Sequence, residues 1–322
     1  MKLLLQRQAF TMLELIFVTV ILGVVASIGS SVIAQVYESY IMQRSVHNAS
    51  IKTELAINQL SNRLTYRINR SLLARVPGTT GLAPANAVPL SGITLADAAT
   101  HTGLEWIGYD NDGFSAIFNP SNWSGFCDLN KSNYSKIKTI GSRLTSSSGT
   151  KPSAQEILNN LSRSTTAPVP AITFMGPSQY RTGMDYNTTC MYKTDGTGCM
   201  FPVSLTNNST LTFRNSGLTG DRINGQMIYS EFYQLAASAY AVIPENKHKI
   251  DNEDVWDIYL YADYQPWDGQ NYSNGSRSLL AKNVSVFRFR DETGSVRIKI
   301  CSIEQTANTN TISICKEKAI IR

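Results

Sequence analysis

A single carboxylic acid, Glu14, lies within a long apolar run near the start of the chain. It is the only ionisable side chain between Phe10 and Ala34. A charge in a membrane segment is unfavourable by roughly 2.5–3.5 kcal/mol on insertion scales, and it is tolerated when it finds a partner. One interpretation of Glu14 is a membrane-helix acid that faces a generic partner or extends toward the cytoplasmic interface.

Two of the five cysteines are placed to close a hairpin near the C-terminal end. Cys301 and Cys315 are equidistant from Asn308, the centre of a turn-prone stretch. The register that makes them face each other also opposes Lys299 to Glu317, a favourable cross-strand pair. A disulfide closing about 15 residues is expected to stabilise the fold by roughly 3 kcal/mol.

A second pair, Cys190 and Cys199, flanks the turn at residues 193–197, and we predict a second disulfide there. Cys127 is left over: it is either free or a competitor for one of the other four cysteines. The alternative for both pairs is reduced, buried thiols. Neither pair has zinc-finger spacing.

Two acidic stretches could bind a cation. Tyr109–Gly113 has the start of a calcium loop but lacks the third acid and the distal glutamate, so we favour a solvated turn. Asp251–Asp257 clusters carboxylates, and we favour an exposed lead-in to a strand. We predict no metal.

Further motifs give weak signals. Asn187 is a candidate glycosylation acceptor, because Asp185 lies two residues before it. The aromatic run Trp256–Trp267 is expected to pack in the core or on a sheet face, with a sugar- or surface-binding patch as the minority interpretation. No serine–histidine–aspartate set, phosphate loop or pair of catalytic acids is found, so we predict neither an enzyme nor a cofactor.

The composition is that of a folded protein outside the cytoplasm. The chain has 322 residues, 42% hydrophobic and 16% charged, with a formal net charge of +5. It is rich in asparagine, serine and threonine, and its positive residues are scattered. We therefore infer no nucleic-acid partner.

The apolar run itself is long enough to cross a bilayer as a helix. Lys2 and Arg7 precede it, and the positive-inside rule keeps that end in the cytoplasm. A secretory signal peptide is the alternative, with Val32-Ile33-Ala34 as its cleavage site. The run is longer than a signal core and contains an acid, which argues against this alternative.

The stretch Ala9-Phe10-Thr11-Met12-Leu13-Glu14-Leu15-Ile16, followed by apolar residues, resembles the leader of type IV prepilins and type II secretion pseudopilins. The resemblance implies cleavage by prepilin peptidase between Ala9 and Phe10 and N-methylation of Phe10. The family usually has glycine where this chain has Ala9. Glu14 becomes the fifth mature residue, which implies pairing with the N-terminal amine of a neighbouring subunit and a fixed axial register.

Apolar residues at spacings of four or five extend the helical pattern toward Arg75. They are Ile51, Leu55, Leu60, Leu64, Ile68 and Leu72. Val76-Pro77-Gly78 is expected to end the helix. The sequence thus predicts a cleaved leader at 1–9, a membrane or fibre-core helix at 10–34 and its amphipathic continuation at 35–75.

The rest of the chain is predicted to form an irregular connection and then a sheet. Residues 76–170 lack strong periodicity, apart from a short helical patch at Ala154–Leu161. Strand-like runs separated by polar turns fill 171–322 and indicate a mostly antiparallel sheet. These runs are Ala171–Met175, Thr210–Arg214, Gln226–Ile243, Val255–Tyr264, Leu279–Arg290, Ser295–Glu304 and Thr311–Ile321. The fold class is α+β, a long helix on an antiparallel sheet. The disulfide hairpin also resembles the C-terminal disulfide loop of type IV pilins.

These expectations combine into one functional hypothesis. The chain resembles a minor pilin or pseudopilin, held in the inner membrane with its C-terminal domain in the periplasm and then assembled into a fibre. Implied partners are other subunits, prepilin peptidase, the inner-membrane assembly platform and the lipid bilayer. The competing hypothesis is a membrane-anchored periplasmic binding protein or adhesin that does not polymerise.

Overall fold

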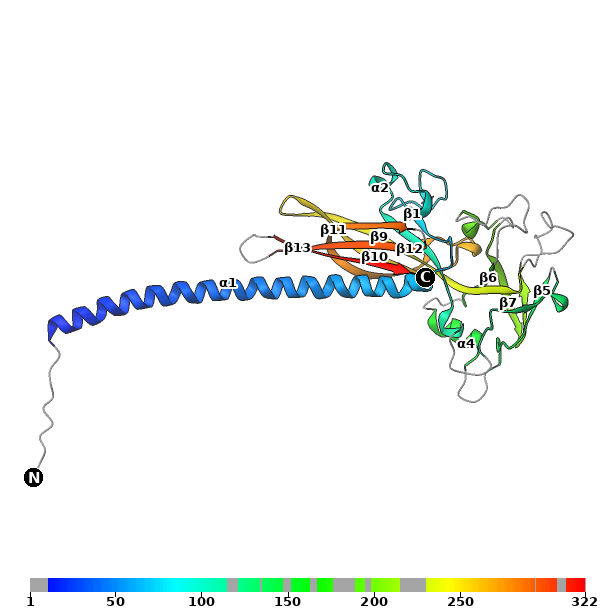
Figure 1. The fold of residues 1–322 in the computed structure, drawn as a ribbon, viewed down its shortest axis with the longest axis horizontal. Coiled ribbons are helices and arrows are strands. Elements are labelled where there is room, and N and C mark those ends of the chain that lie inside the picture. Colours follow the sequence, from blue (N-terminus) through cyan, green and yellow to red (C-terminus); the bar gives the residue numbers. More distant parts are fainter. Residues whose placement is uncertain are drawn as a thin grey trace, which may run out of the picture.

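In the computed structural model, one long helix projects from a head built around an antiparallel sheet (Figure 1). The structure describes residues 11–114, 121–133, 135–146, 152–162, 167–175, 189–194, 198–214, 230–292, 294–305 and 311–321. The helices are α1 (Met12–Thr65), α2 (Asp97–Thr100), α3 (Asn111–Phe114) and α4 (Ala154–Leu161). The predicted α+β class, a long helix packed on an antiparallel sheet, is confirmed.

The described residues form a sheet of 13 strands. The strands are β1 (Leu73–Arg75), β2 (Ala87–Pro89), β3 (Gly103–Tyr109), β4 (Cys127–Asp128), β5 (Lys136–Thr139), β6 (Ala171–Met175), β7 (Phe201–Asn207), β8 (Thr210–Phe213), β9 (Phe232–Ile250), β10 (Glu253–Tyr264), β11 (Ser276–Glu292), β12 (Ser295–Gln305) and β13 (Thr311–Ile321). Their order is β13-β12-β11-β10-β9-β6-β7-β8-β5-β4, while β3 pairs with β9 and with β1, which in turn pairs with β2. The named strand pairs are antiparallel.

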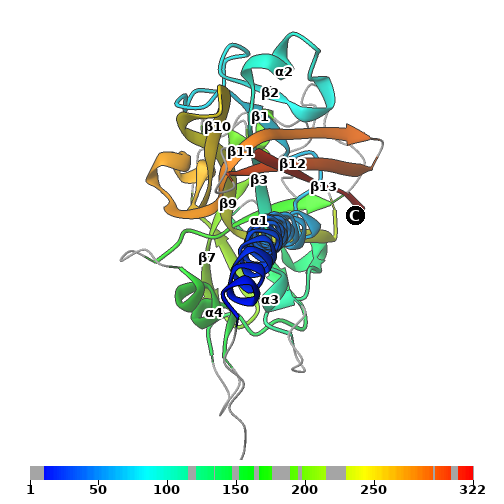
Figure 2. The same cartoon turned by 90° about the vertical axis from the view of Figure 1, so that its left-hand side faces the viewer.

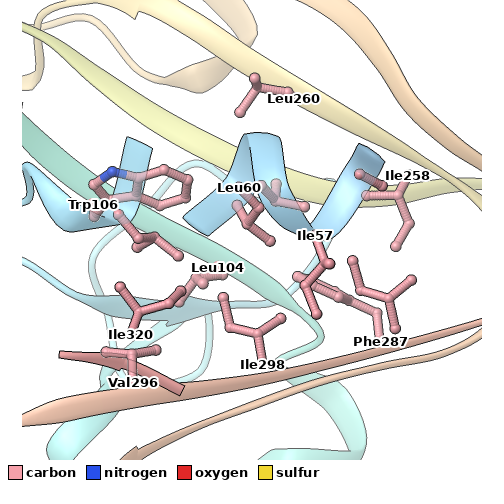
Figure 3. Packing of buried hydrophobic residues seen from close by; sticks show 14 of the residues in the cluster. Ile57, Leu60, Leu104, Trp106, Ile258, Leu260, Phe287, Val296, Ile298 and Ile320 are labelled. Atoms are coloured by element: carbon pink, nitrogen blue, oxygen red, sulfur yellow. The ribbon is translucent and has the colours of Figure 1, made fainter. Parts of the chain in front are cut away.

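The sheet holds α1 through the C-terminal part of the helix. Ile57, Leu60 and Leu64 pack against apolar side chains of β3 and β9–β13 (Figure 3). Figure 2, viewed from the end where α1 begins, places β11, β12 and β13 on one side of the helix. Burial of these side chains is the main term that holds the two elements together.

The buried face of α1 differs from the predicted stripe. Leu60 and Leu64 are buried as expected, but Ile51 is 44% and Leu55 56% exposed. A spacing of four or five residues drifts around a helix that turns every 3.6. Small residues complete the buried face instead, among them Ala49 and Thr53.

The helix also ends ten residues before the predicted limit at Arg75. The Tyr66 amide donates to carbonyls of the last turn, and then the chain turns to pair with β3. The Ile68 amide donates to the Ile107 carbonyl at 2.8 Å, and the Tyr109 amide donates to the Tyr66 carbonyl at 2.9 Å. Arg70 has a positive φ of 63°. Ile68 and Leu72 remain buried, so the apolar pattern continued although the helix did not.

The predicted irregular connection at 76–170 contains regular structure. Strand β3 lies within it, pairs with β9 and contributes Leu104 and Trp106 to the core. Six of its seven residues are buried, so the strand lacks the alternation that marks a half-buried strand. The helical patch Ala154–Leu161 is confirmed as α4, and Ser153 and Glu156 form its capping box.

Candidate functional site

The N-terminal part of α1 stands free of the head. The large apolar side chains from Met12 to Ile33 are each more than half exposed. By its length and composition, α1 can cross a membrane, and none of its most apolar window is buried by the head. The head contains the disulfides Cys190–Cys199 and Cys301–Cys315, which are typical of extracytoplasmic domains. The helix and the disulfides therefore indicate a membrane-anchored protein with an extracytoplasmic domain.

The exposed helix begins with a capping box made by Thr11 and Glu14. The Thr11 amide donates to Glu14 Oε2 at 3.4 Å, and the Glu14 amide donates to Thr11 Oγ1 at 3.4 Å. This arrangement satisfies two groups that a helix start leaves unpaired, and it puts a negative charge at the positive end of the helix dipole. Glu14 thus has a structural role in the single protomer. Its role in subunit register remains a prediction.

The two residues predicted to flank the processing site, Ala9 and Phe10, lie outside the described residues. Asn187, the candidate glycosylation acceptor, does so as well. These assignments therefore stay predictions.

Three polar contacts join the head to the C-terminal part of α1. Thr53 Oγ1 lies 2.6 Å from Ser302 Oγ in a buried contact. Lys52 Nζ lies 2.6 Å from Glu304 Oε1, and Lys316 Nζ lies 3.1 Å from Glu54 Oε2. The first contact is buried and joins α1 to β12. The two ion pairs are more exposed and add little.

Both predicted disulfides are present among the described residues. Cys301 pairs with Cys315 between β12 and β13, and the predicted register with Lys299 opposite Glu317 is confirmed. Glu317 forms an ion pair with Arg297, whose Nη1 lies 3.3 Å from Glu317 Oε1. The hairpin that packs on α1 is therefore covalently closed.

The other three cysteines lie outside this hairpin. Cys190 pairs with Cys199, and both are buried. Cys127 is free and buried. Burial raises the pKa of its thiol to about 11, with the nearby Glu231 and Asp128 acting in the same direction. Because the thiolate is the reactive form, burial keeps Cys127 in the less reactive thiol form at neutral pH.

The stretch Tyr109–Gly113, which has the start of a calcium loop, is not a solvated turn, contrary to our expectation. Asp110 is 8% exposed, and its Oδ1 accepts the Gly113 amide at 3.1 Å, capping the short helix α3. Desolvation by burial raises the pKa of Asp110 to about 6. Within the part of the chain that the structure describes, no group of three or more histidine, cysteine, aspartate or glutamate residues could hold a metal.

The second acidic stretch forms the turn between β9 and β10, as expected. Asp251 and Asn252 adopt positive φ angles at the tip. Asp254 Oδ2 lies 2.7 Å from Lys247 Nζ on the neighbouring strand, and both side chains are exposed. Asp251 and Asp254 are surface charges, whereas Asp257 is partly buried and its Oδ2 accepts the Asn246 side-chain amide at 3.3 Å.

The aromatic run packs in the core or on a sheet face, which was the favoured interpretation; Trp256 and Tyr259 are partly buried. Tyr261, Tyr264 and Trp267 are buried. The guanidinium carbon of Arg277 lies 3.5 Å from the centre of the Tyr259 ring. The three buried rings are not accessible to a ligand.

One polar network was not predicted from the sequence. Arg75 and Glu105 form an ion pair, and Glu105 Oε1 accepts the Tyr264 hydroxyl at 2.7 Å. Burial, followed by the nearby Glu105 charge, raises the pKa of Tyr264 well above its usual range, so the phenol stays a donor. Arg75 Nη1 also donates to the Gly81 carbonyl at 2.9 Å. Arg75 and Glu105 are 30 residues apart, and only the pairing of β1 with β3 brings them together.

Comparison with models of protein families, with curated proteins and with solved structures yields no match. The architecture nevertheless agrees with that of a pilin, since a long apolar N-terminal helix packs on an antiparallel sheet. Any assignment finer than this architecture has to come from the residues themselves.

Proposed function

We propose that the protein is a minor pilin or pseudopilin, a structural or priming subunit of a type IV pilus or type II secretion pseudopilus. One observation carries the proposal. An apolar helix that is free over its N-terminal part begins at a Thr11–Glu14 capping box and ends inside a head domain. A helix that exposes so many large apolar side chains requires lipid or neighbouring helices around it.

In this proposal the subunit waits in the inner membrane and is then processed. Prepilin peptidase cuts between Ala9 and Phe10, and Phe10 is methylated. In the chain, Phe10 directly precedes Thr11, whose amide Glu14 Oε2 accepts in the single protomer. In a fibre the carboxylate pairs with the amine of a neighbouring Phe10, because a buried acid among packed apolar helices requires a positive partner.

The assignment to a minor subunit rests on the size of the head. The head extends from the end of α1 to the C-terminal hairpin and carries a second group of strands beyond β6. Such a head is bulky for dense helical packing. A rare priming or tip-proximal position suits it better than the repeated body of a fibre.

The state of the N-terminus tests this proposal. The protein is purified from membranes of its own host, and its first residue is determined by mass spectrometry. N-methylated Phe10 supports the proposal. A chain that starts at Met1 indicates the non-polymerising anchored binding protein or adhesin, and a chain that starts at Gln35 indicates secretion behind a signal peptide.

The role of Glu14 is tested separately by Glu14→Ala and by Glu38→Ala, a matched exposed glutamate further along α1. We expect Glu14→Ala to abolish incorporation into fibres while the protein still accumulates in the membrane. Glu38→Ala should assemble normally. Normal assembly of Glu14→Ala would contradict the register role.

A further inference from the structure

A cavity of about 490 Å³ opens beside the end of α1, among β3, α4 and strands β9–β11. Asn62, Arg63 and Tyr66 of α1 and its C-cap line one side, and the segment after β3 lines another. The end of α4 and strands β9, β10 and β11 close the remaining walls. The volume falls within the usual range of small-molecule sites, about 300–1,000 Å³.

The cavity exists because adjacent strands carry small residues at this place. Gly108 of β3 is paired with Ser238 of β9, and Ala262 of β10 and Ser278 of β11 also line the space. A Cβ on Gly108 would lie 2.7 Å from Cε2 of Tyr240, so glycine lets that ring lie against the β3 backbone. Large side chains at these positions would fill the space.

The wall opposite α1 is held by a bulge in β10. The register of β10 against β9 shifts between Ala262 and Tyr264, and Asp263 adopts a φ of 67°. The Asp263 amide donates to Ser238 Oγ at 2.7 Å, and its Oδ2 accepts the Ser162 hydroxyl at 3.1 Å. These bonds connect β9, β10 and the end of α4, so the wall is built before any ligand arrives.

Aromatic rings supply the apolar part of the lining. Tyr66 and Tyr109 meet edge to face at 5.8 Å, and the guanidinium of Arg63 lies 5.2 Å from the centre of the Tyr240 ring. Tyr66 is 39% exposed. Rings of this kind pack well against the C–H faces of a ligand while their hydroxyl groups stay hydrated.

The polar side chains that line the cavity include positive and negative charges, and they include both hydrogen-bond donors and acceptors. Arg63 is a donor, while Asp110, Asp112 and Asp263 are carboxylates, and asparagine and serine side chains lie between them. Asp110 Oδ2 is buried and has no hydrogen-bond partner within the described ranges. The three carboxylates would repel an anion, and the Arg63 guanidinium would offset part of their attraction for a cation. A neutral ligand rich in hydroxyl groups can both donate to the acids and accept from the arginine.

We propose that this cavity binds a neutral saccharide of a few sugar units. The proposal does not depend on the assignment as a pilin, since it rests on the head alone. It places a sugar site at the end of α1 instead of at the aromatic run Trp256–Trp267, where the rings are mostly buried.

The test uses the full chain in lipid nanodiscs, with empty nanodiscs as a blank. The probes are a printed array of neutral di-, tri- and tetrasaccharides of hexoses and N-acetylhexosamines. Positive probes are then titrated by calorimetry. We expect at least one probe to bind saturably, and binding to none of them would overturn the proposal.

Variants locate the binding. Ser278→Phe fills the cavity from an exposed position and should abolish binding, and Tyr66→Ala should weaken it about tenfold or more. Tyr40→Ala, an exposed tyrosine of α1 outside the cavity, should leave it unchanged. Each variant is first shown to have an unchanged melting temperature. Undiminished binding by both Ser278→Phe and Tyr66→Ala would also overturn the proposal.

Discussion

The Nε atom of Arg75 lies 2.5 Å from Oε2 of Glu105, and both side chains are only 2% exposed. The pair joins β1 to β3 beneath the loop that follows Pro77. Because two charges without water are stable only together, the pair determines where the chain can run after α1.

Removing one partner of this pair should destabilise the head strongly. We expect Glu105→Gln to lower the free energy of unfolding by about 3–5 kcal/mol, since Arg75 is left buried with a neutral partner. Asp254→Asn breaks the exposed ion pair with Lys247 and should change the free energy of unfolding by less than about 1 kcal/mol. Urea unfolding followed by tryptophan fluorescence measures both, and equal effects would refute the argument.

The two faces of α1 should respond differently to the same substitution. Leu60 is 1% and Leu55 56% exposed on one helix. Leu60→Ala should destabilise the head by about 2–5 kcal/mol through the lost contacts and the cavity that it leaves, and Leu55→Ala by less than about 1 kcal/mol. Chemical unfolding in nanodiscs compares the two. A larger effect of Leu55→Ala would mean that another face of α1 meets the sheet.

Loss of the hairpin disulfide should be measurable and local. Cys301→Ser together with Cys315→Ser opens a loop closed by residues 14 apart and should reduce stability by about 3 kcal/mol in the chain-entropy model. Hydrogen exchange should rise in β12 and β13 more than in β6. Cys127→Ser is the matched control, because that thiol is free. A uniform rise in exchange across the sheet would argue against a local role.

Asp110 should make the folded state less stable as the pH rises. Its pKa is about 6 in the folded chain and near 3.8 in the unfolded chain. The folded chain therefore binds this proton more tightly than the unfolded chain does. The contribution is fully present below about pH 3.8 and is lost as the pH rises through 6.

Asp110→Asn removes this titration. At pH 7.5 the variant should be more stable than the parent by up to about 3 kcal/mol, and near pH 4 the two should differ little. Melting temperatures measured from pH 4 to pH 8 test this, with Asp112→Asn, an exposed neighbour, as the control. Parallel curves for the parent and Asp110→Asn would contradict the expected linkage.

Local signals in the sequence were sufficient for several elements. The predicted ranges for β6, β13 and α4 agree with the structure at both ends. Alternation marks β13 and a capping box marks α4, while β6 is a short apolar run. The pairing of Cys301 with Cys315 followed from the symmetry of a hairpin. Such features depend on residues close together in the chain.

Features that depend on distant residues were missed. Strand β3 contains a glutamate whose burial depends on Arg75 and Tyr264, which are distant in the chain, so its sequence does not look like a buried strand. The end of α1 was misplaced because backbone groups of β3 compete for the chain after Tyr66. The cavity collects residues from α1, β3, α4, β9, β10 and β11, and no short pattern in the sequence could reveal it.

The position along α1 at which the head begins to pack on the helix determines the distance between the head and the membrane surface. Ala49 is the first residue of α1 that the head buries completely. If Phe10–Ala34 fills the bilayer, residues 35–48 add about 20 Å of helix before that point, at 1.5 Å per residue. The helix then acts as a stalk, and at the level of the lipid it is not shielded by the sheet. Other transmembrane helices can approach it from any side without displacing the head.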